Sequence, residues 1–304
     1  GDYMEAGLSV VIPAKNEVES VGQVVARILD SLAGSEIPSE VIVVDDGSDD
    51  GTGRVAAEAG AIVLTNESSR GYGASLKLGI RASSHETIAI ADADGTYPVG
   101  RIPELYGMLE GYAMVVGART GDSVAIPAAR KPAKWVVRKL ASFIAGISIP
   151  DVNSGLRVFR SKVAFRYFRM LPSGFSFTTT ITVACLCDSL PVRFVPIDYR
   201  PRSGRSKLNA MHFFNFLALV ARLSVLFRPL RVFIPAATAL LALGVLKAVL
   251  DVTEAVDLYG WSFLVEGYEV ISTSSAVLLI LGGFLFMTGM LADALAVHRP
   301  GTDF

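Results

Sequence analysis

The N-terminal part of the chain alternates short apolar runs with stretches of helical periodicity. The apolar runs are 8–13, 40–48, 61–65, 87–94 and 113–119, and a helical pattern follows the first of them as far as Leu32. Apolar runs joined by helices are typical of a mostly parallel sheet that helices cover on both faces. The pattern therefore predicts an α/β domain.

Two long apolar segments, 232–250 and 270–295, occupy the C-terminal part of the chain. Each comes close to the roughly 20 apolar residues that a bilayer-spanning helix needs. Pro235 is predicted to lie in the first turn of its helix, where proline is tolerated, and Lys247 near the far end is expected to snorkel. A pair of buried core helices is the alternative, which the length and the near-absence of polar residues disfavour. We therefore expect two transmembrane helices within 232–297.

The charged residues around these segments are distributed asymmetrically. The stretch 251–269 between them holds acidic residues and no Lys or Arg, whereas the approach 199–231 holds Lys and Arg and no acid. By the positive-inside rule, the N-terminal domain and the tail 298–304 are expected in the cytoplasm and the acidic loop outside. The net charge of −1 averages over these regions of opposite charge and therefore excludes no class of partner.

Two further segments, 130–147 and 209–227, mix cationic with large apolar residues. This mixture predicts basic amphipathic helices that lie on a membrane surface. Cations near such a surface are also attracted to anionic lipid heads, by about 1 kcal/mol each. The predicted organisation is thus a cytoplasmic domain (1–199), a basic juxtamembrane segment (200–231) and the two spans, with an anionic bilayer as a partner and no nucleic acid.

Acidic residues follow the second and fourth predicted strands. Asp45 and Asp46 end the second, and Asp92 and Asp94 end the fourth. Ligands bind beyond the carboxyl ends of the strands in such sheets. Neighbouring carboxylates are costly to bury unless a cation joins them, and Mg²⁺ and Mn²⁺ bind carboxylates together with phosphate oxygens. We therefore predict that Asp92 and Asp94 hold a divalent metal and a nucleotide diphosphate; capping a helix or shaping a turn is the alternative.

A nucleotide is expected here, but not one that a glycine-rich loop binds. The sequence after the first strand, PAKNEVESVG, lacks both the G-x-G-x-x-G of a dehydrogenase and a P-loop. Asp45 is expected to bond the nucleoside and Asp46 to be a turn residue. Asn16 and Glu17 could begin a helix or contact the nucleotide.

Seven motifs occur in an order that resembles a known family. They are VIPAKNE, VVDDGSDDGT, RGYGASLKLGI, DADGTYP, GAR, DVNSGLRVFR and RSGRSK, and they extend over roughly Leu8 to Arg231. The set resembles the family 2 glycosyltransferases of the GT-A fold, a Rossmann-like α/β fold. Within that family it is similar to the polyprenyl-phosphate glycosyltransferases, which include dolichyl-phosphate mannose synthase and bacterial undecaprenyl-phosphate sugar transferases.

The resemblance implies a role for each matching residue. The nucleotide pocket would be lined by Pro13, Asn16, Glu17 and Asp45, and the metal and diphosphate would be held by Asp92 and Asp94. The cationic path for the diphosphate and the acceptor phosphate would be formed by Arg119, Arg130, Arg202 and Lys207. The sugar and acceptor end would be shaped by Asp151, Ser154 and Arg157.

The implied reaction moves a sugar from a UDP- or GDP-sugar to a polyprenyl phosphate, with a divalent metal and inversion at the anomeric carbon. The chain departs from many relatives at two motifs. Where they have D-A-D-L-Q, this chain has Gly95 after its acidic pair, and where they have an acid in G-x-x-F-x-x-E, it has Thr179 and Thr180. A transferase for another lipid or a polysaccharide, or a non-catalytic membrane scaffold, is the alternative. The serines at 272–275 and the glycines of the second span could support a homo-oligomer.

Overall fold

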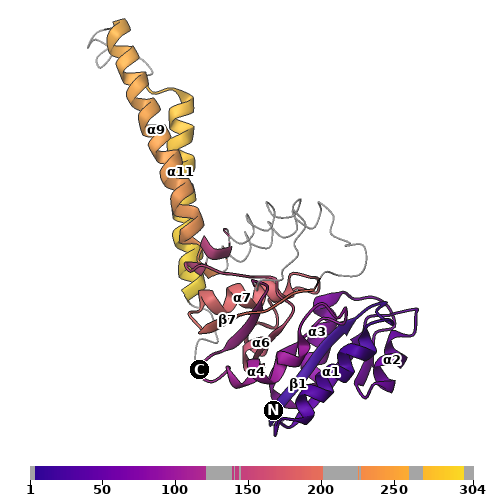
Figure 1. Ribbon diagram of the computed structural model, residues 1–304. Coiled ribbons are helices and arrows are strands. Elements are labelled where there is room, and N and C mark those ends of the chain that lie inside the picture. Colours follow the sequence, from indigo (N-terminus) through magenta and orange to yellow (C-terminus); the bar gives the residue numbers. More distant parts are fainter. Residues whose placement is uncertain are drawn as a thin grey trace. The chain divides into compact units, whose positions relative to one another are not determined.

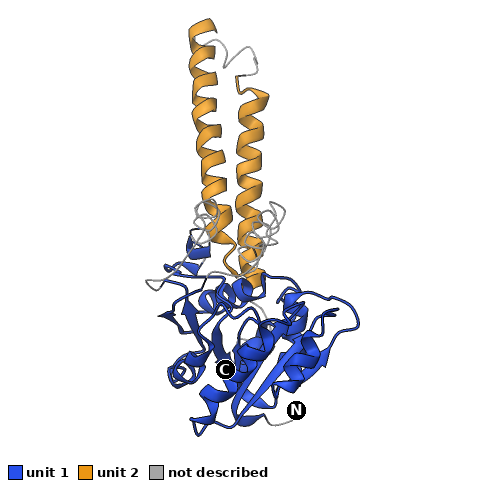
Figure 2. Ribbon diagram, turned by 45° about the vertical axis from the view of Figure 1, so that its right-hand side comes forward, with its two compact units in different colours: residues 1–220 blue, residues 221–304 orange. Residues whose placement is uncertain are grey.

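The structure is a computed structural model that describes residues 4–120, 139, 141–143, 145–200, 225, 227–259 and 270–297. The chain divides into two compact units, residues 1–220 and 221–304 (Figure 2). Most of the predicted amphipathic segments 130–147 and 209–227 lies outside the described residues.

The described residues of unit 1 form a seven-stranded sheet, some strands of which are labelled in Figure 1. The strands are β1 (Glu5–Ala14), β2 (Ser39–Asp45), β3 (Ile62–Thr65), β4 (His85–Ile90), β5 (Met114–Ala118), β6 (Arg157–Arg160) and β7 (Val192–Pro196), in the order β3-β2-β1-β4-β6-β5-β7. All pairings are parallel except those of β6, which runs antiparallel to β4 and β5. The predicted mostly parallel α/β sheet is thereby confirmed.

Helices cover both faces of this sheet. They are α1 (Val21–Ala33), α2 (Thr52–Glu58), α3 (Tyr72–Ala82), α4 (Ile102–Gly107), α6 (Ser161–Tyr167) and α7 (Phe177–Cys187), with a 3₁₀ turn η1 (Val99–Arg101). Helix α1 buries Val21, Val25 and Ile28, which share one side at helical spacing. Helix α3 lies on the opposite face, where a Cβ atom at Gly79 would be 2.3 Å from Val11 Cγ1, so this approach requires a glycine.

Strand boundaries differ from the prediction near the acidic residues. β4 ends at Ile90, so Asp92 and Asp94 lie in the turn beyond the strand and not within it. The apolar pattern of the sequence did not predict β6 and β7. These strands are short, and β6 begins and ends with arginine, so neither presents the long apolar run by which the other strands were predicted.

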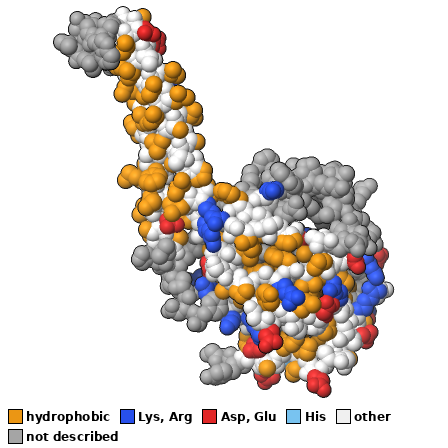
Figure 3. Space-filling view, turned by 60° about the vertical axis from the view of Figure 1, so that its left-hand side comes forward, with side chains coloured by type: hydrophobic (Ala, Val, Ile, Leu, Met, Phe, Trp, Pro, Cys, Tyr) orange, Lys and Arg blue, Asp and Glu red, His pale blue; other side chains and the backbone are white. Residues whose placement is uncertain are grey.

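The described residues of unit 2 form two apolar helices, α9 (Leu230–Tyr259) and α11 (Thr273–Val297). Both are long and apolar enough to cross a membrane, and only 11% and 17% of their most apolar windows are buried. The low burial argues against two core helices. Figure 3 shows apolar side chains covering much of the visible surface of the described part of this unit, and exposed ones include Leu246, Ile280 and Met287.

Small residues bring α9 and α11 close together. A Cβ atom at Gly244 would be 2.9 Å from Leu279, and one at Gly282 would be 2.7 Å from Leu241. Packing through small residues is typical of helices in membranes. The prediction for Pro235 was wrong, because α9 begins at Leu230 and the proline therefore lies inside the helix.

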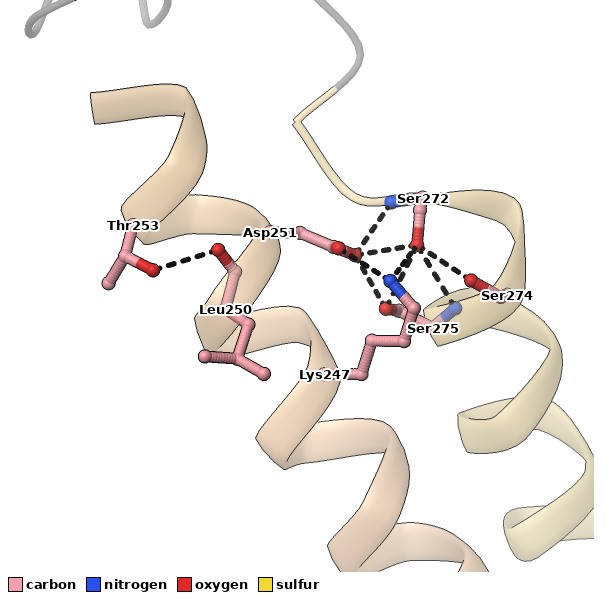
Figure 4. A network of polar contacts seen from close by, with 7 residues as sticks. All are labelled: Lys247, Leu250, Asp251, Thr253, Ser272, Ser274 and Ser275. Atoms are coloured by element: carbon pink, nitrogen blue, oxygen red, sulfur yellow. Dashed lines mark hydrogen bonds and ion pairs between the residues drawn. The ribbon is translucent and has the colours of Figure 1, made fainter. Parts of the chain in front are cut away.

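A carboxylate of α9 binds the N-terminal end of α11 (Figure 4). Asp251 accepts hydrogen bonds from the backbone N–H of Ser272 at 2.9 Å, from the Ser272 hydroxyl at 2.7 Å and from the Ser275 hydroxyl at 2.5 Å. Lys247 donates to Asp251 at 2.8 Å and to Ser272 at 3.2 Å. Asp251 thus satisfies one backbone N–H just before α11, which has no intrahelical partner, and Lys247 pairs with it.

Candidate active site

The predicted site residues lie around one edge of the sheet. Strands β1, β2, β4 and β5 end at this edge, because they run in the same direction. Strand β6 runs the opposite way, so the loop 151–156 before it reaches the same edge between the ends of β4 and β5. The antiparallel strand therefore adds a loop from the middle of the chain to the residues that follow the parallel strands.

The loops after β1 and β2 are tied together. Ser48 links them, since its hydroxyl accepts the backbone N–H of Asn16 at 3.0 Å and its N–H donates to Asp45 at 2.9 Å. Asn16 has a positive φ of 55° and its side-chain oxygen accepts the N–H of Asp49. The backbone N–H of Glu17 donates to Thr52. The structure thereby brings Asn16, Glu17 and Asp45 together ahead of α1, rather than placing Asn16 and Glu17 in its first turn.

Pro13 lies in β1, where it is buried and is the register partner of Val44 in β2. Its ring is therefore close to the strand end that leads to Asp45. The four predicted nucleotide-pocket residues come from two adjacent strand ends.

Asp46 anchors the loop that precedes α3. Its carboxylate accepts the side-chain N–H of Asn66, the hydroxyl of Ser69 and the backbone N–H groups of Arg70 and Gly71, at 2.7–2.9 Å. Burial would raise the pKa of Asp46, but these hydrogen bonds outweigh it and lower the pKa to about 2. Asp46 is therefore an ionised structural anchor, and the side chain of Asp45 is directed elsewhere, to Ser48 and close to Gly53.

Asp92 lies between a tyrosine and a stretch of backbone. The hydroxyl of Tyr72, at the start of α3, donates to Asp92 Oδ1 at 2.9 Å. On the other side, a Cβ atom at Gly155 would be 2.6 Å from Asp92 Oδ2. Gly155 is fixed in turn, because its N–H donates to the hydroxyl of Tyr97 at 2.7 Å.

Asp94 lies at the surface two residues further on. Its Oδ1 accepts the backbone N–H and the hydroxyl of Thr96, at 3.1 and 2.6 Å. Asp94 and Thr96 also line a surface hollow together with residues of α1 and Arg200. The Asp94 carboxylate is thus accessible to a ligand.

The carboxylates of Asp92 and Asp94 at this edge fit a hard divalent cation whose remaining ligands include phosphate oxygens. No cluster of three or more His, Cys, Asp or Glu side chains occurs among the described residues, so a metal held entirely by such side chains is not seen there. Mg²⁺ is characteristically bound by one or two carboxylates, with phosphate and water oxygens completing its shell. Asp92 and Asp94 are both partly exposed and offer such a pair.

Arg119 and Asp151 form a bidentate ion pair. The Nε and Nη2 atoms of Arg119 donate to the two carboxylate oxygens at 2.7 and 2.9 Å, and the Arg119 backbone N–H donates at 3.0 Å. Burial would lower the pKa of Arg119 and raise that of Asp151, but their mutual attraction shifts each pKa the other way. The ring of Tyr199 lies against the guanidinium at 5.3 Å.

Arg157 and Ser154 are completely buried. Arg157 donates to the carbonyl oxygens of Ser154 and Thr178 and to the Thr182 hydroxyl, and its Nε has no partner among the described residues. Ser154 donates to the carbonyl oxygen of Gly117. Both side chains therefore hold the 151–156 loop from beneath, joining it to α7 and to β5.

Three predicted cations, Arg130, Arg202 and Lys207, lie outside the described residues. Thr179 and Thr180, which stand where many relatives have an acidic residue, belong to the described residues. Both of their hydroxyls donate hydrogen bonds within the protein. Thr179 donates to the side-chain oxygen of Asn153 and Thr180 to the carbonyl oxygen of Ser176.

Sequence reasoning missed the aromatic residues at this edge. Tyr72 and Phe175 stack at 5.5 Å, and Tyr97 and Tyr199 meet edge to face at 5.1 Å. A signal was present, since Tyr72 lies within the RGYG stretch and Tyr97 three residues after Asp94. Tyrosine is equally common in cores, however, so its contact with a carboxylate could not be inferred without the fold.

A family model described as "Glycosyl transferase family 2" matches residues 9–168. The chain belongs to this family. A dolichyl-phosphate hexose transferase of Haloferax volcanii is 31% identical over 213 residues, covering 68% of this chain and 89% of the relative. An undecaprenyl-phosphate mannosyltransferase of Micrococcus luteus is 27% identical over 213 residues, covering 66% and 86%.

A crystal structure of glucosyl-3-phosphoglycerate synthase from Mycobacterium tuberculosis, in complex with Mn²⁺, UDP-glucose and phosphoglyceric acid, has the same fold. It superposes with a TM-score of 0.58 at 22% sequence identity, covering 72% of this chain and 80% of that one. This likeness confirms the GT-A type of sheet. Because the chain belongs to a glycosyltransferase family and ligands bind beyond the carboxyl ends of the strands in such sheets, the edge described above is its candidate active site.

Proposed function

We propose that this glycosyltransferase moves a sugar from a nucleotide-sugar to a polyprenyl phosphate. The observation that carries the proposal is the pair Asp92 and Asp94 beyond β4, of which Asp92 lies against Gly155 in the loop 151–156. Relatives named for dolichyl- and undecaprenyl-phosphate acceptors support the acceptor class. The two apolar helices of unit 2 support a reaction at a membrane.

Asp92 and Asp94 would hold a divalent cation, Mg²⁺ or Mn²⁺, and through it the donor diphosphate. When bound, such a cation stabilises the negative charge that develops on the leaving diphosphate. The structure of the mycobacterial synthase with Mn²⁺ and UDP-glucose supports the use of a metal in this fold. Asp45, with Pro13, Asn16 and Glu17 beside it, would bind the nucleoside.

The acceptor phosphate does not need a general base. Its second pKa is about 6, so it is mostly dianionic at neutral pH. The hydroxyls of Thr179 and Thr180, which donate within the protein, are therefore compatible with the reaction. A phosphate oxygen attacks the anomeric carbon in line as the bond to the diphosphate breaks, which inverts that carbon.

The main task of the protein is then to bring two polyanions together. Arginine binds phosphate in a bidentate manner, and we assign this role to Arg119, Arg130, Arg202 and Lys207. Asp151, Ser154 and Arg157 shape the sugar and acceptor end, the last two by supporting the 151–156 loop from beneath.

We further propose that unit 1 and the C-terminus are cytoplasmic and that the acidic loop is outside. The distribution of Lys and Arg along the sequence supports this orientation. The basic segments would bind anionic lipid heads and place the site at the height of the lipid phosphate. Copies of the chain could associate through the apolar helices.

Turnover of the purified full chain tests the reaction. The protein is incubated with undecaprenyl or dolichyl phosphate and a panel of UDP- and GDP-sugars, with Mg²⁺, Mn²⁺ or EDTA. We expect one donor to give a lipid-phosphate-sugar that EDTA abolishes, and Asp94→Ala to remove it while Asp49→Ala, an exposed neighbour of the β2 turn, does not. Product on a lipid hydroxyl or a polysaccharide would reject the acceptor, and nucleotide binding without product from any acceptor would favour a scaffold.

A further inference from the structure

The contacts of the Asp92 side chain indicate which residue orients it. Tyr72 belongs to α3, whereas Asp92 follows β4, and the two meet through the hydrogen bond of 2.9 Å to Oδ1. The backbone of Gly155 lies against the same carboxylate from another part of the chain. A carboxylate that a hydroxyl and a stretch of backbone hold on two sides has few orientations left.

Tyr72 is itself held firmly. The two residues before it, Arg70 and Gly71, donate their N–H groups to Asp46. On the other side, the N–H of Ala74 donates to the carbonyl oxygen of Ser173 at 3.0 Å. The start of α3 is thus fixed to the end of β2 and to the loop before α7.

The packing around Tyr72 leaves little freedom. A Cβ atom at Gly73 would be 2.2 Å from the carbonyl oxygen of Pro172, so α3 and that loop are in backbone contact. The ring of Phe175, 69% exposed, stacks on the Tyr72 ring at an interplanar angle of 23°. The phenol therefore approaches Asp92 from a preset direction.

We propose that Tyr72 is a positioning residue whose hydroxyl orients Asp92 for the divalent cation and the donor diphosphate. The inference rests on the proposed function, because it assumes that Asp92 contacts this pair. Partners that orient metal-binding side chains typically contribute 10–100-fold to metal affinity.

Tyr72→Phe removes only the hydroxyl, and the chain offers a matched control. Tyr167, at the end of α6, donates its hydroxyl to Asp188 at 2.7 Å, so Tyr167→Phe makes the same chemical change at another carboxylate. Binding of UDP and of GDP to the full chain in detergent is titrated with Mn²⁺ by calorimetry. Thermal unfolding of each variant is followed in parallel.

We expect Tyr72→Phe to raise the Mn²⁺ concentration for half-maximal nucleotide binding by about tenfold, with Tyr167→Phe unchanged. Equal Mn²⁺ dependence in Tyr72→Phe and the wild type would overturn the role of Tyr72 while leaving the proposed function intact. A loss that Tyr167→Phe shares would also overturn it, as a general effect of losing a hydroxyl. If the wild type bound neither nucleotide in a metal-dependent way, the proposed function would fail first.

Discussion

The guanidinium of Arg119 and the carboxylate of Asp151 lie face to face, joined by two hydrogen bonds of 2.7 and 2.9 Å. The two side chains are only 14% and 12% exposed. Removal of one partner from a buried ion pair leaves an uncompensated charge, which costs about 3–5 kcal/mol. The residue assigned to the cationic path thus also holds the 151–156 loop at the site.

We therefore expect Arg119→Ala and Asp151→Ala each to lower the unfolding midpoint of unit 1 clearly, and the double variant to lose less than the sum. A double-mutant cycle on the purified chain measures the coupling. If the effects of the two substitutions simply added, the interaction between Arg119 and Asp151 would contribute nothing to stability.

The low pKa of Asp46 predicts a dependence of stability on pH. Because the pKa of Asp46 is about 2 in the fold, below its ordinary value of 3.8, the carboxylate stabilises the fold above pH 3.8. This contribution is lost as the pH falls toward 2. Asp46→Asn should therefore be less stable than the wild type at neutral pH, and the difference should shrink between pH 4 and 2.

Unfolding midpoints of both proteins across this pH range check the prediction. Asp49→Asn, on an exposed neighbouring side chain, is the matched control and should follow the wild type. A difference between Asp46→Asn and the wild type that is independent of pH would show that the carboxylate charge is not what anchors the loop.

The contact between Gly155 and Asp92 predicts a sharp effect of a single methyl group. In Gly155→Ala the new Cβ atom would lie 2.6 Å from Oδ2, so the carboxylate has to move. We expect metal-dependent nucleotide binding to weaken by about tenfold or more, because the displaced carboxylate is no longer oriented for the metal. Gly107→Ala is the control, because nothing lies within 4 Å of its Cβ position, and unchanged binding in Gly155→Ala would place the metal elsewhere.

Asp251 predicts the stability of the helix pair in unit 2. Its side chain is 9% exposed and accepts hydrogen bonds from the N-terminal end of α11. Asp251→Ala should destabilise the pair, because its hydrogen bonds to the charged carboxylate are lost. Unfolding of the chain in detergent measures this change, with the exposed Glu254→Ala as control; equal stability of the two variants would contradict it.

The sequence by itself predicted a mostly parallel α/β sheet and placed acidic residues after two of its strands. Apolar runs separated by helical patterns have few folded solutions, since each face has to be buried. Residues that follow parallel strands reach one edge for geometric reasons, so Asp45, Asp92 and Arg119 could be assigned to it in advance. The length and apolar character of α9 and α11 are likewise local properties, which can be predicted from the sequence of each segment alone.

Only the tertiary structure decided which side chains meet. The pairing of Arg119 with Asp151 and the burial of Arg157 depend on β6 lying antiparallel between β4 and β5. The approach of Tyr72 to Asp92 depends on where the start of α3 lies relative to the end of β4. Strand order and direction arise from contacts between residues far apart in the chain, which local periodicity does not encode. Similarly, Asp45 and Asp46 are neighbours with the same chemistry, and only the folded loop at 66–71 showed that Asp46 is its anchor.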